Sequence, residues 1–262
     1  MLHIELTDQT LPWVIDPETI VFCHGVAINC NIWAEWLPTL TPYFKIAKFD
    51  TRGFGRSYRS DETINWSMDQ LADDILEVAE RSGAQRFHLV GESMGGTACL
   101  HLATRPDAPL LSLTCVSTSH RGGSVERVGS WRQEVDALGM DAWSDGMMER
   151  RFSPCALEDR QREWFSDTQR RTAASSLLDA ADLLIRTDLT DRLGMITAPT
   201  LLIAPDSSPF VPLDIPAVIH RLIPKSELAV FPQTRHGLPF SHARVCAETL
   251  LSFLQRSGFP RP

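Results

Sequence analysis

The 262-residue sequence contains no apolar run close to the roughly 20 residues that a membrane-spanning helix requires. Its first residues, Met1 to Glu5, have neither the basic start nor the apolar centre of a secretory signal peptide. We therefore expect a protein that does not bind a membrane and that resides in the cytoplasm.

The six cysteines form no C-x-x-C pair, and several of them lie in apolar stretches. This arrangement favours buried thiols over disulfides or a zinc site. The sequence also lacks the H-E-x-x-H zinc motif, the phosphate-binding P-loop and the glycine-rich dinucleotide fingerprint. We expect no metal and no cofactor, so side chains and backbone donors must supply the chemistry.

Positively charged residues are also fewer than negatively charged ones, with 25 Lys and Arg against 33 Asp and Glu. A nucleic-acid-binding protein would need a basic face, so we expect no nucleic-acid partner. Hydrophobic residues make up 43% of the sequence, enough to bury the core of one α/β domain at this length. The expected partner is a small-molecule substrate.

Short apolar runs typical of buried strands alternate with segments of helical period. The predicted strands cover residues 18–23, 44–49, 87–90, 110–116, 200–204 and 227–231, and the clearest predicted helices cover 32–37, 68–81, 96–103 and 244–254. This alternation predicts the α/β class, with a mostly parallel central sheet flanked by helices.

One long segment, residues 122–187, interrupts the alternation because it contains helical patterns with large side chains and no good strand. We predict a core domain from residues 1–121 and 188–262, with residues 122–187 forming a helical cap, or lid, over the sheet. The large side chains of the cap can line a pocket, pack internally or form a contact in a homo-oligomer. Trp131 is a candidate for substrate contact as one of these large side chains. Arg150 and Arg151 are candidates because a guanidinium binds a carboxylate through two hydrogen bonds. The alternative for both arginines is a solvated helix face.

The most informative motif is Gly91-Glu92-Ser93-Met94-Gly95, which reads G-x-S-x-G. A predicted strand precedes it and a predicted helix follows, which is the setting of a nucleophile elbow. In such a turn the serine hydroxyl stands clear of the backbone, while the glycines let strand and helix approach closely. We predict that Ser93 is a nucleophile.

A serine nucleophile needs a base to accept its proton and donors to hold the oxyanion that forms. His236 is the leading candidate for the base, because it follows the last predicted strand and precedes the closing helix. His242 is its rival. The segment His24-Gly25-Val26-Ala27 follows the first long strand and resembles the H-G-x oxyanion loop, so we expect the backbone N–H groups of Val26 and Met94 to form the oxyanion hole. His24 is expected to hold this loop.

The chain resembles enzymes of the α/β-hydrolase fold. Three blocks carry the resemblance: His24-Gly25 with Trp33 downstream, Asp50-Thr51-Arg52-Gly53-Phe54-Gly55-Arg56-Ser57, and the Gly91–Gly96 elbow. The second block is structural in that family. Within this family, the chain is most similar to 3-oxoadipate enol-lactonases. The similar segments are Gly139-Met140 and Arg150-Arg151-Phe152-Ser153-Pro154 in the cap and the later run from Asp188 to Leu201. The resemblance implies a Ser-His-acid triad and an esterase or lactonase activity.

The acid of the triad is where the sequence departs from the family. The resemblance places an aspartate just after the strand 200–204, but matching the prolines of Pro209-Phe210-Val211-Pro212 puts Ser208 at that place. Asp206 lies two residues earlier, and we expect it to reach His236 through a rearranged loop. Two alternatives stay open: an acid from elsewhere, such as Asp214, or a neutral hydrogen bond from Ser208.

These residues predict a cofactor-independent serine hydrolase that acts on a small acyl compound through an acyl-enzyme, and the resemblance implies that the substrate is a small carboxylic ester or enol-lactone. Ser93 attacks, His236 moves the proton and Asp206 orients His236. The alternatives are a carbon–carbon bond hydrolase of the same fold, and a non-catalytic receptor, since fold alone does not decide function.

Overall fold

The computed structural model of the chain describes residues 1–61 and 63–259. Within these residues one sheet has seven strands in the order β1-β3-β2-β4-β5-β6-β7. All strand pairs are parallel except β1 with β3, so the predicted mostly parallel sheet is confirmed. The strands are β1 (His3–Thr7), β2 (Thr19–Cys23), β3 (Lys45–Asp50), β4 (Phe87–Glu92), β5 (Leu110–Val116), β6 (Thr200–Pro205) and β7 (Ser226–Phe231).

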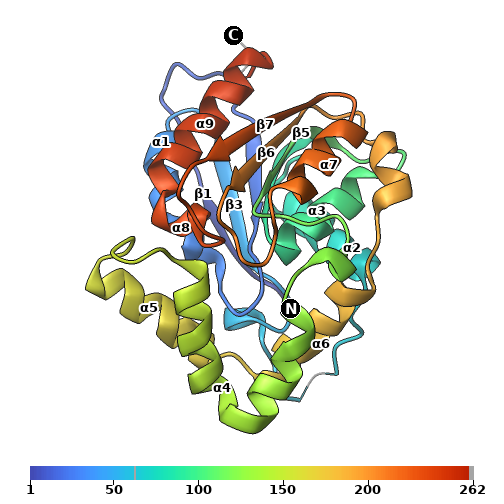
Figure 1. Cartoon of the computed structure of the whole chain (residues 1–262). Coiled ribbons are helices and arrows are strands. Elements are labelled where there is room, and N and C mark those ends of the chain that lie inside the picture. The colour runs from blue at the N-terminus through green and yellow to red at the C-terminus, as the bar shows by residue number, and fades with distance from the viewer. Residues whose placement is uncertain (62, 260–262) are drawn as a thin grey trace.

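Helices cover both faces of the sheet (Figure 1). One face carries α2 (Met68–Arg81), α3 (Met94–Ala103) and α7 (Asp214–Leu222), and the other carries α1 (Leu37–Leu40) and α9 (Ala243–Arg256). The strands separate two buried clusters because successive side chains of a strand point to opposite faces. In β2, Val21 packs in the cluster under α2 and α3, whereas Ile20 and Phe22 pack in the cluster under α9.

Local sequence accounts for helix α2, one of the two longest helices of the core. Helix α2 starts where the Ser67 hydroxyl accepts a hydrogen bond from the backbone N–H of Gln70. Its buried residues include Leu71, Ile75 and Val78, which the helical period places on one face. Shorter elements connect the core: η1 (Cys30–Trp36), η2 (Gly55–Ser57), η5 (Thr190–Met195) and α8 (Leu238–Ser241).

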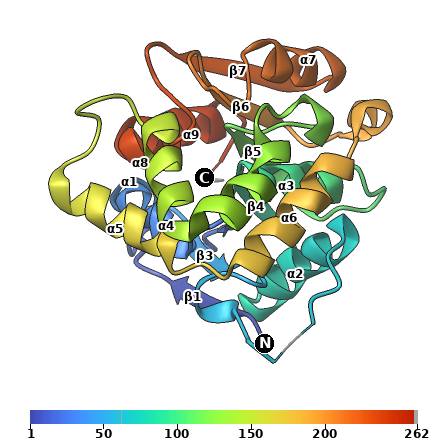
Figure 2. The same cartoon turned by 60° about the horizontal axis from the view of Figure 1, so that its bottom comes forward.

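Between β5 and β6 the chain forms η3 (Gly122–Ser124), η4 (Val128–Ser130), α4 (Trp131–Arg151), α5 (Asp159–Arg170) and α6 (Ala174–Arg186). In Figure 2 these three α-helices lie together in front of the sheet. Helix α4 bends at Gly139, whose φ of 79° is non-helical. The segments that enter and leave this region pair antiparallel at Arg121 and Asp188. We propose that residues 122–187 form one cap, closed at its base by this pair.

None of the helices in residues 1–61 and 63–259 combines the length and the apolar character needed to span a bilayer.

Candidate active site

The turn that carries Ser93 has the geometry of a nucleophile elbow. Ser93 lies between β4 and α3 with φ 53° and ψ −121°, a conformation that costs energy for a residue with a side chain. Its N–H donates a hydrogen bond to the carbonyl of Val116, which fixes the turn against β5. A Cβ at Gly95 would lie 2.6 Å from the carbonyl oxygen of Cys23, so only glycine lets α3 approach the end of β2 this closely.

Ser93 and His236 are 143 positions apart in the sequence, and the fold brings their side chains together. Oγ of Ser93 and Nε2 of His236 are 3.1 Å apart. His236 is buried in the turn between β7 and α8, and its rival His242 instead bonds Ser241 at the start of α9. At 3.1 Å one proton can pass between the hydroxyl and the imidazole.

The electrostatic surroundings keep His236 neutral. Burial lowers the pKa of His236 well below its ordinary value of 6.5, and the positive charge of Arg151 lowers it further. A base must be unprotonated to work, and a lowered pKa keeps it unprotonated at more acid pH.

We therefore expect kcat/KM to stay on its plateau well below pH 6.5, and to fall only as the pH reaches the lowered pKa of His236. The measurement is a pH–rate profile on a neutral ester, with circular dichroism at each pH to show that the protein stays folded. A loss of activity with a midpoint at or above pH 6.5 contradicts this expectation.

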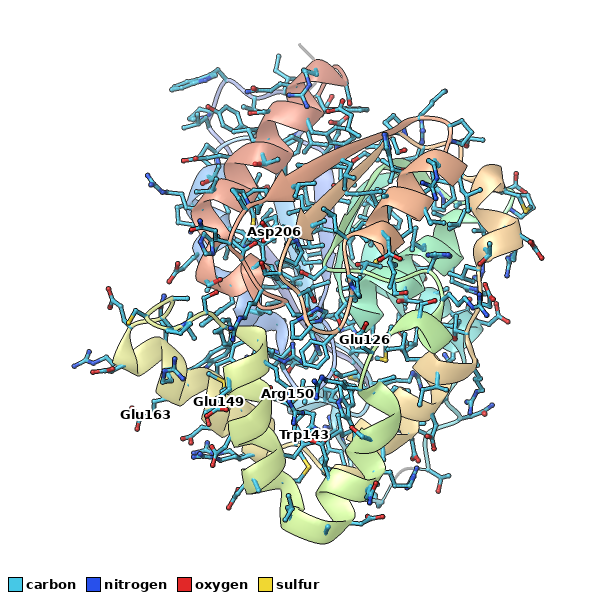
Figure 3. All side chains as sticks on the ribbon, in the orientation of Figure 1. Glu126, Trp143, Glu149, Arg150, Glu163 and Asp206 are labelled. Atoms are coloured by element: carbon cyan, nitrogen blue, oxygen red, sulfur yellow. The ribbon has the colours of Figure 1, made fainter. Side chains whose placement is uncertain are left out.

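The structure does not bring Asp206 to His236, which corrects the predicted role of this acid. Asp206 is exposed in the loop after β6 (Figure 3), where it accepts a hydrogen bond from the hydroxyl of Ser207 at 2.8 Å. Ser208 is buried, and its Oγ lies 3.3 Å from Nδ1 of His236. The chain turns between the two residues, so the carboxylate faces solvent and the hydroxyl faces the imidazole. Asp214, the other acid considered, lies in the first turn of α7.

The loop after β2 and the start of α3 carry the two backbone N–H groups, those of Val26 and Met94, that we propose as oxyanion donors. Met94 begins α3, so its N–H has no partner within the helix. Within the described residues, neither this N–H nor that of Val26 donates a backbone hydrogen bond. His24 braces the loop as expected, because its Nε2 accepts from the N–H of Thr51 at 2.9 Å. Its Nδ1 therefore carries the proton and donates to the carbonyl of Gly25 at 2.7 Å.

A narrow pocket with a volume of about 20 Å³ opens at Ser93 and His236. Of the three residues predicted to contact substrate, Trp131 and Arg151 line this pocket. Arg150 does not line this pocket, and its Nη1 donates a hydrogen bond to a carboxylate oxygen of Glu134 at 3.0 Å.

Arg151 is the charged group of this pocket, and it is only 2% exposed. Its Nη1 lies 3.8 Å from Oε1 of Glu92, and its guanidinium carbon lies 5.8 Å from the ring centre of Phe165. Its side chain makes no hydrogen bond to any described residue, and Nε is buried without a partner. A buried guanidinium with unused donors is costly unless a ligand supplies the acceptors.

Glu92 is the residue of the site that sequence reasoning missed. It precedes Ser93 at the end of β4 and is fully buried, and burial raises the pKa of its carboxyl group. The guanidinium of Arg151 and the backbone N–H of Gly25 oppose this rise. The available signal was a carboxylate at the end of a predicted buried strand, since such a residue needs a buried counter-ion.

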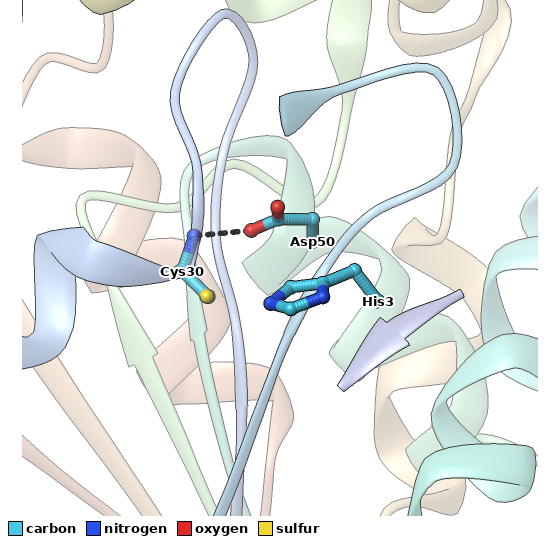
Figure 4. Close-up of side chains that lie close together, drawn as sticks. All are labelled: His3, Cys30 and Asp50. Atoms are coloured by element: carbon cyan, nitrogen blue, oxygen red, sulfur yellow. Dashed lines mark hydrogen bonds between the residues drawn. The ribbon is translucent and has the colours of Figure 1, made fainter. Parts of the chain in front are cut away.

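A second cluster, formed by His3, Cys30 and Asp50 (Figure 4), has ligand atoms within 4.8 Å of one another. Its chemistry does not suit a cation. Asp50 already accepts hydrogen bonds from the N–H groups of Cys30 at 2.8 Å and Arg56 at 2.7 Å. Burial raises the pKa of the Cys30 thiol to about 12, and the ammonium of Lys48 lies 3.7 Å from its sulfur. We interpret the cluster as a structural brace for the loop after β3.

Comparisons with known proteins agree with this fold. A family model described as alpha/beta hydrolase fold matches residues 18–243. The chain is 26% identical over 250 residues to the pimeloyl-acyl-carrier-protein methyl ester esterase of Vibrio vulnificus, covering 89% of this chain and 93% of the relative. It is 23% identical over 205 residues to 3-oxoadipate enol-lactonase 1 of Acinetobacter baylyi, covering 72% and 71%. The crystal structure of the enol-lactonase from Burkholderia xenovorans superposes with a TM-score of 0.87 at 19% identity, covering 97% of this chain and 96% of that one. The predicted fold and the hydrolase class are thereby confirmed, and the chain belongs to the alpha/beta hydrolase fold family.

Proposed function

We propose that the protein is a serine hydrolase that cleaves a small carboxylic ester or lactone through an acyl-enzyme. The observation that carries the proposal is the 3.1 Å separation between Oγ of Ser93 and Nε2 of His236 at the mouth of a pocket. In the proposed reaction Ser93 attacks the carbonyl carbon while His236 takes its proton. The N–H groups of Val26 and Met94 stabilise the oxyanion, and His236 then returns the proton to the leaving oxygen.

Water completes the cycle. With the alcohol product gone, His236 takes a proton from a water molecule as that water attacks the acyl carbon. His236 then gives the proton to Oγ of Ser93 as the bond to the acyl group breaks and the acid leaves. In a lactone both products remain on one molecule, so a single hydroxy acid leaves. Apart from the substrate and this water molecule, these reaction steps use only groups that the chain itself supplies.

The pocket favours a small substrate with an acidic group. Its walls are largely apolar, with Val125, Trp131 and Phe210 among them, and the pocket is narrow, which favours a small acyl group. We propose that Arg151 binds a carboxylate of the substrate, because its unused donors match the two oxygens of that group.

We expect wild-type protein to prefer a half-ester such as monomethyl succinate to the neutral dimethyl ester. Arg151→Met should lower that preference by roughly 10- to 100-fold, because a hydrogen bond to a charged group contributes about 1.5–3 kcal/mol. The measurement is the ratio of kcat/KM for the two esters. Arg150→Met is the matched control, since Arg150 bonds Glu134 away from the pocket, and it should keep the wild-type ratio. An equal loss of preference in both variants would rule out a specific role for Arg151.

A fluorophosphonate probe separates the proposed hydrolase from a receptor with the same fold. We expect the probe to label wild-type protein at Ser93 and to leave Ser93→Ala unlabelled, since only an activated serine attacks phosphorus. An unlabelled wild-type protein that still binds ligand saturably would mark the chain as a receptor.

Product analysis by mass spectrometry on ester, lactone and β-diketone substrates separates ester from carbon–carbon hydrolysis.

A further inference from the structure

The hydrogen bonds around Ser208 determine which nitrogen of His236 carries its proton. The Oγ of Ser208 accepts from two backbone N–H groups, that of Phe210 at 3.3 Å and that of Val211 at 3.1 Å. A hydroxyl has two acceptor positions and one proton to donate. Both acceptor positions are therefore in use, and the proton is left for the third neighbour, Nδ1 of His236 at 3.3 Å.

We infer that Ser208 holds His236 in the neutral tautomer that is protonated on Nε2. In this tautomer Nδ1 accepts a hydrogen bond from the hydroxyl of Ser208. In this tautomer His236 donates a hydrogen bond to Ser93 and cannot take its proton. The inference rests on the proposed function, in which Nε2 must be unprotonated when Ser93 attacks. Ser208 is a positioning residue, since it acts only through His236.

The competent tautomer requires that Ser208 change its bonding. A proton on Nδ1 needs an acceptor, and Oγ of Ser208 offers one only if it gives up the bond from Phe210 or Val211. The loss leaves a buried N–H without a partner, so the competent tautomer is a minor population and turnover is reduced by its fraction. Because burial lowers the pKa of His236, the ring is neutral near pH 7 and its two tautomers are the states that compete.

A carboxylate at position 208 would remove this conflict. Its two oxygens offer about four acceptor positions, enough for the N–H groups of Phe210 and Val211 and for the Nδ1 proton of His236. An amide of the same size would preserve the conflict, because its oxygen can accept the backbone bonds while its NH₂ group donates to Nδ1. Ser208→Asp and Ser208→Asn are therefore matched variants that favour opposite tautomers.

The test is the ¹⁵N spectrum of histidine-labelled protein, with the signals of His236 identified by their loss in His236→Gln. We expect a protonated Nε2 in the wild type and in Ser208→Asn, and a protonated Nδ1 in Ser208→Asp. Turnover of Ser208→Asp should exceed that of Ser208→Asn by roughly 100-fold or more, within the roughly 10⁴-fold effect of the same exchange in a well-studied triad. Asp206→Asn should behave as the wild type in both measurements.

Two results would overturn the inference: a wild-type His236 protonated on Nδ1, or Ser208→Asp and Ser208→Asn with equal turnover and the same tautomer. The spectrum does not depend on catalysis. If no variant hydrolyses any ester, the proposed function fails, while the wild-type spectrum still decides which tautomer Ser208 selects.

Discussion

Replacing Ser93 with alanine is expected to lower kcat by roughly 10⁴-fold or more, because removal of the nucleophile ends covalent catalysis and leaves only binding and oxyanion stabilisation. The fold should survive the change. Ser93 holds its turn through backbone bonds, its N–H to Val116 and its carbonyl from Thr97, and alanine retains both. The measurement is steady-state turnover of the preferred ester, with the melting temperature as the check on folding.

His236→Gln is the companion variant. It should lose activity to a similar extent, and the double variant should be little worse than either single one, because nucleophile and base act as a unit. Full activity in a correctly folded Ser93→Ala protein would place the chemistry on another residue.

Glu92→Gln is expected to destabilise the protein by about 3–5 kcal/mol, the usual cost of removing one partner of a buried ion pair. Glu92 and Arg151 are 1% and 2% exposed through their side chains. Arginine cannot lose its proton, so the variant leaves an uncompensated positive charge in the interior. Urea unfolding followed by circular dichroism measures the change in the free energy of unfolding.

Arg151→Met should cost less, because the remaining carboxyl group can take a proton. Burial already raises the pKa of Glu92 above 4.5, and loss of the guanidinium raises it further. A raised carboxyl pKa means that stability is present at low pH and is lost as the pH rises above 4.5. We therefore expect the cost of Arg151→Met to grow with pH, and Glu92→Gln/Arg151→Met to be more stable than Glu92→Gln. Additive effects of the two changes at all pH values would contradict a coupled pair.

The parts of the site that sequence reasoning located are those that local chain geometry determines. Strand, glycine-rich turn and helix are contiguous around Ser93, so the motif predicts the turn itself. His236 was accessible in the same way, because a parallel sheet carries the ends of its strands to one edge and His236 follows the last of them.

The prediction for Asp206 is wrong because it gives the preference for a carboxylate more weight than the spacing of the prolines. Matching the prolines without a gap put Ser208 beside His236, and the structure has Ser208 in that place. Asp206 was preferred because a carboxylate stabilises an imidazolium better than a hydroxyl does. Side-chain direction in a loop depends on a turn whose dihedral angles the sequence does not reveal.

Helix phase explains why only one of two adjacent arginines reaches the pocket. Successive residues of a helix point about 100° apart. The bend at Gly139 resets the phase of α4, so the sequence could not say whether Arg150 or Arg151 faces Ser93. Strand β1 was missed for another reason: it is a five-residue edge strand whose pairing with β3 is antiparallel, outside the β-helix-β alternation.

The most direct test of the central claim is to trap the covalent intermediate. The protein is mixed with a p-nitrophenyl ester of a small acid, quenched with acid within milliseconds and analysed by peptide mass spectrometry. We predict an added acyl mass on the peptide that contains Ser93, formed together with a burst of p-nitrophenol, and neither signal in Ser93→Ala. Steady hydrolysis of the ester by the wild type, with no burst and no acyl group on Ser93, would contradict nucleophilic catalysis by this residue.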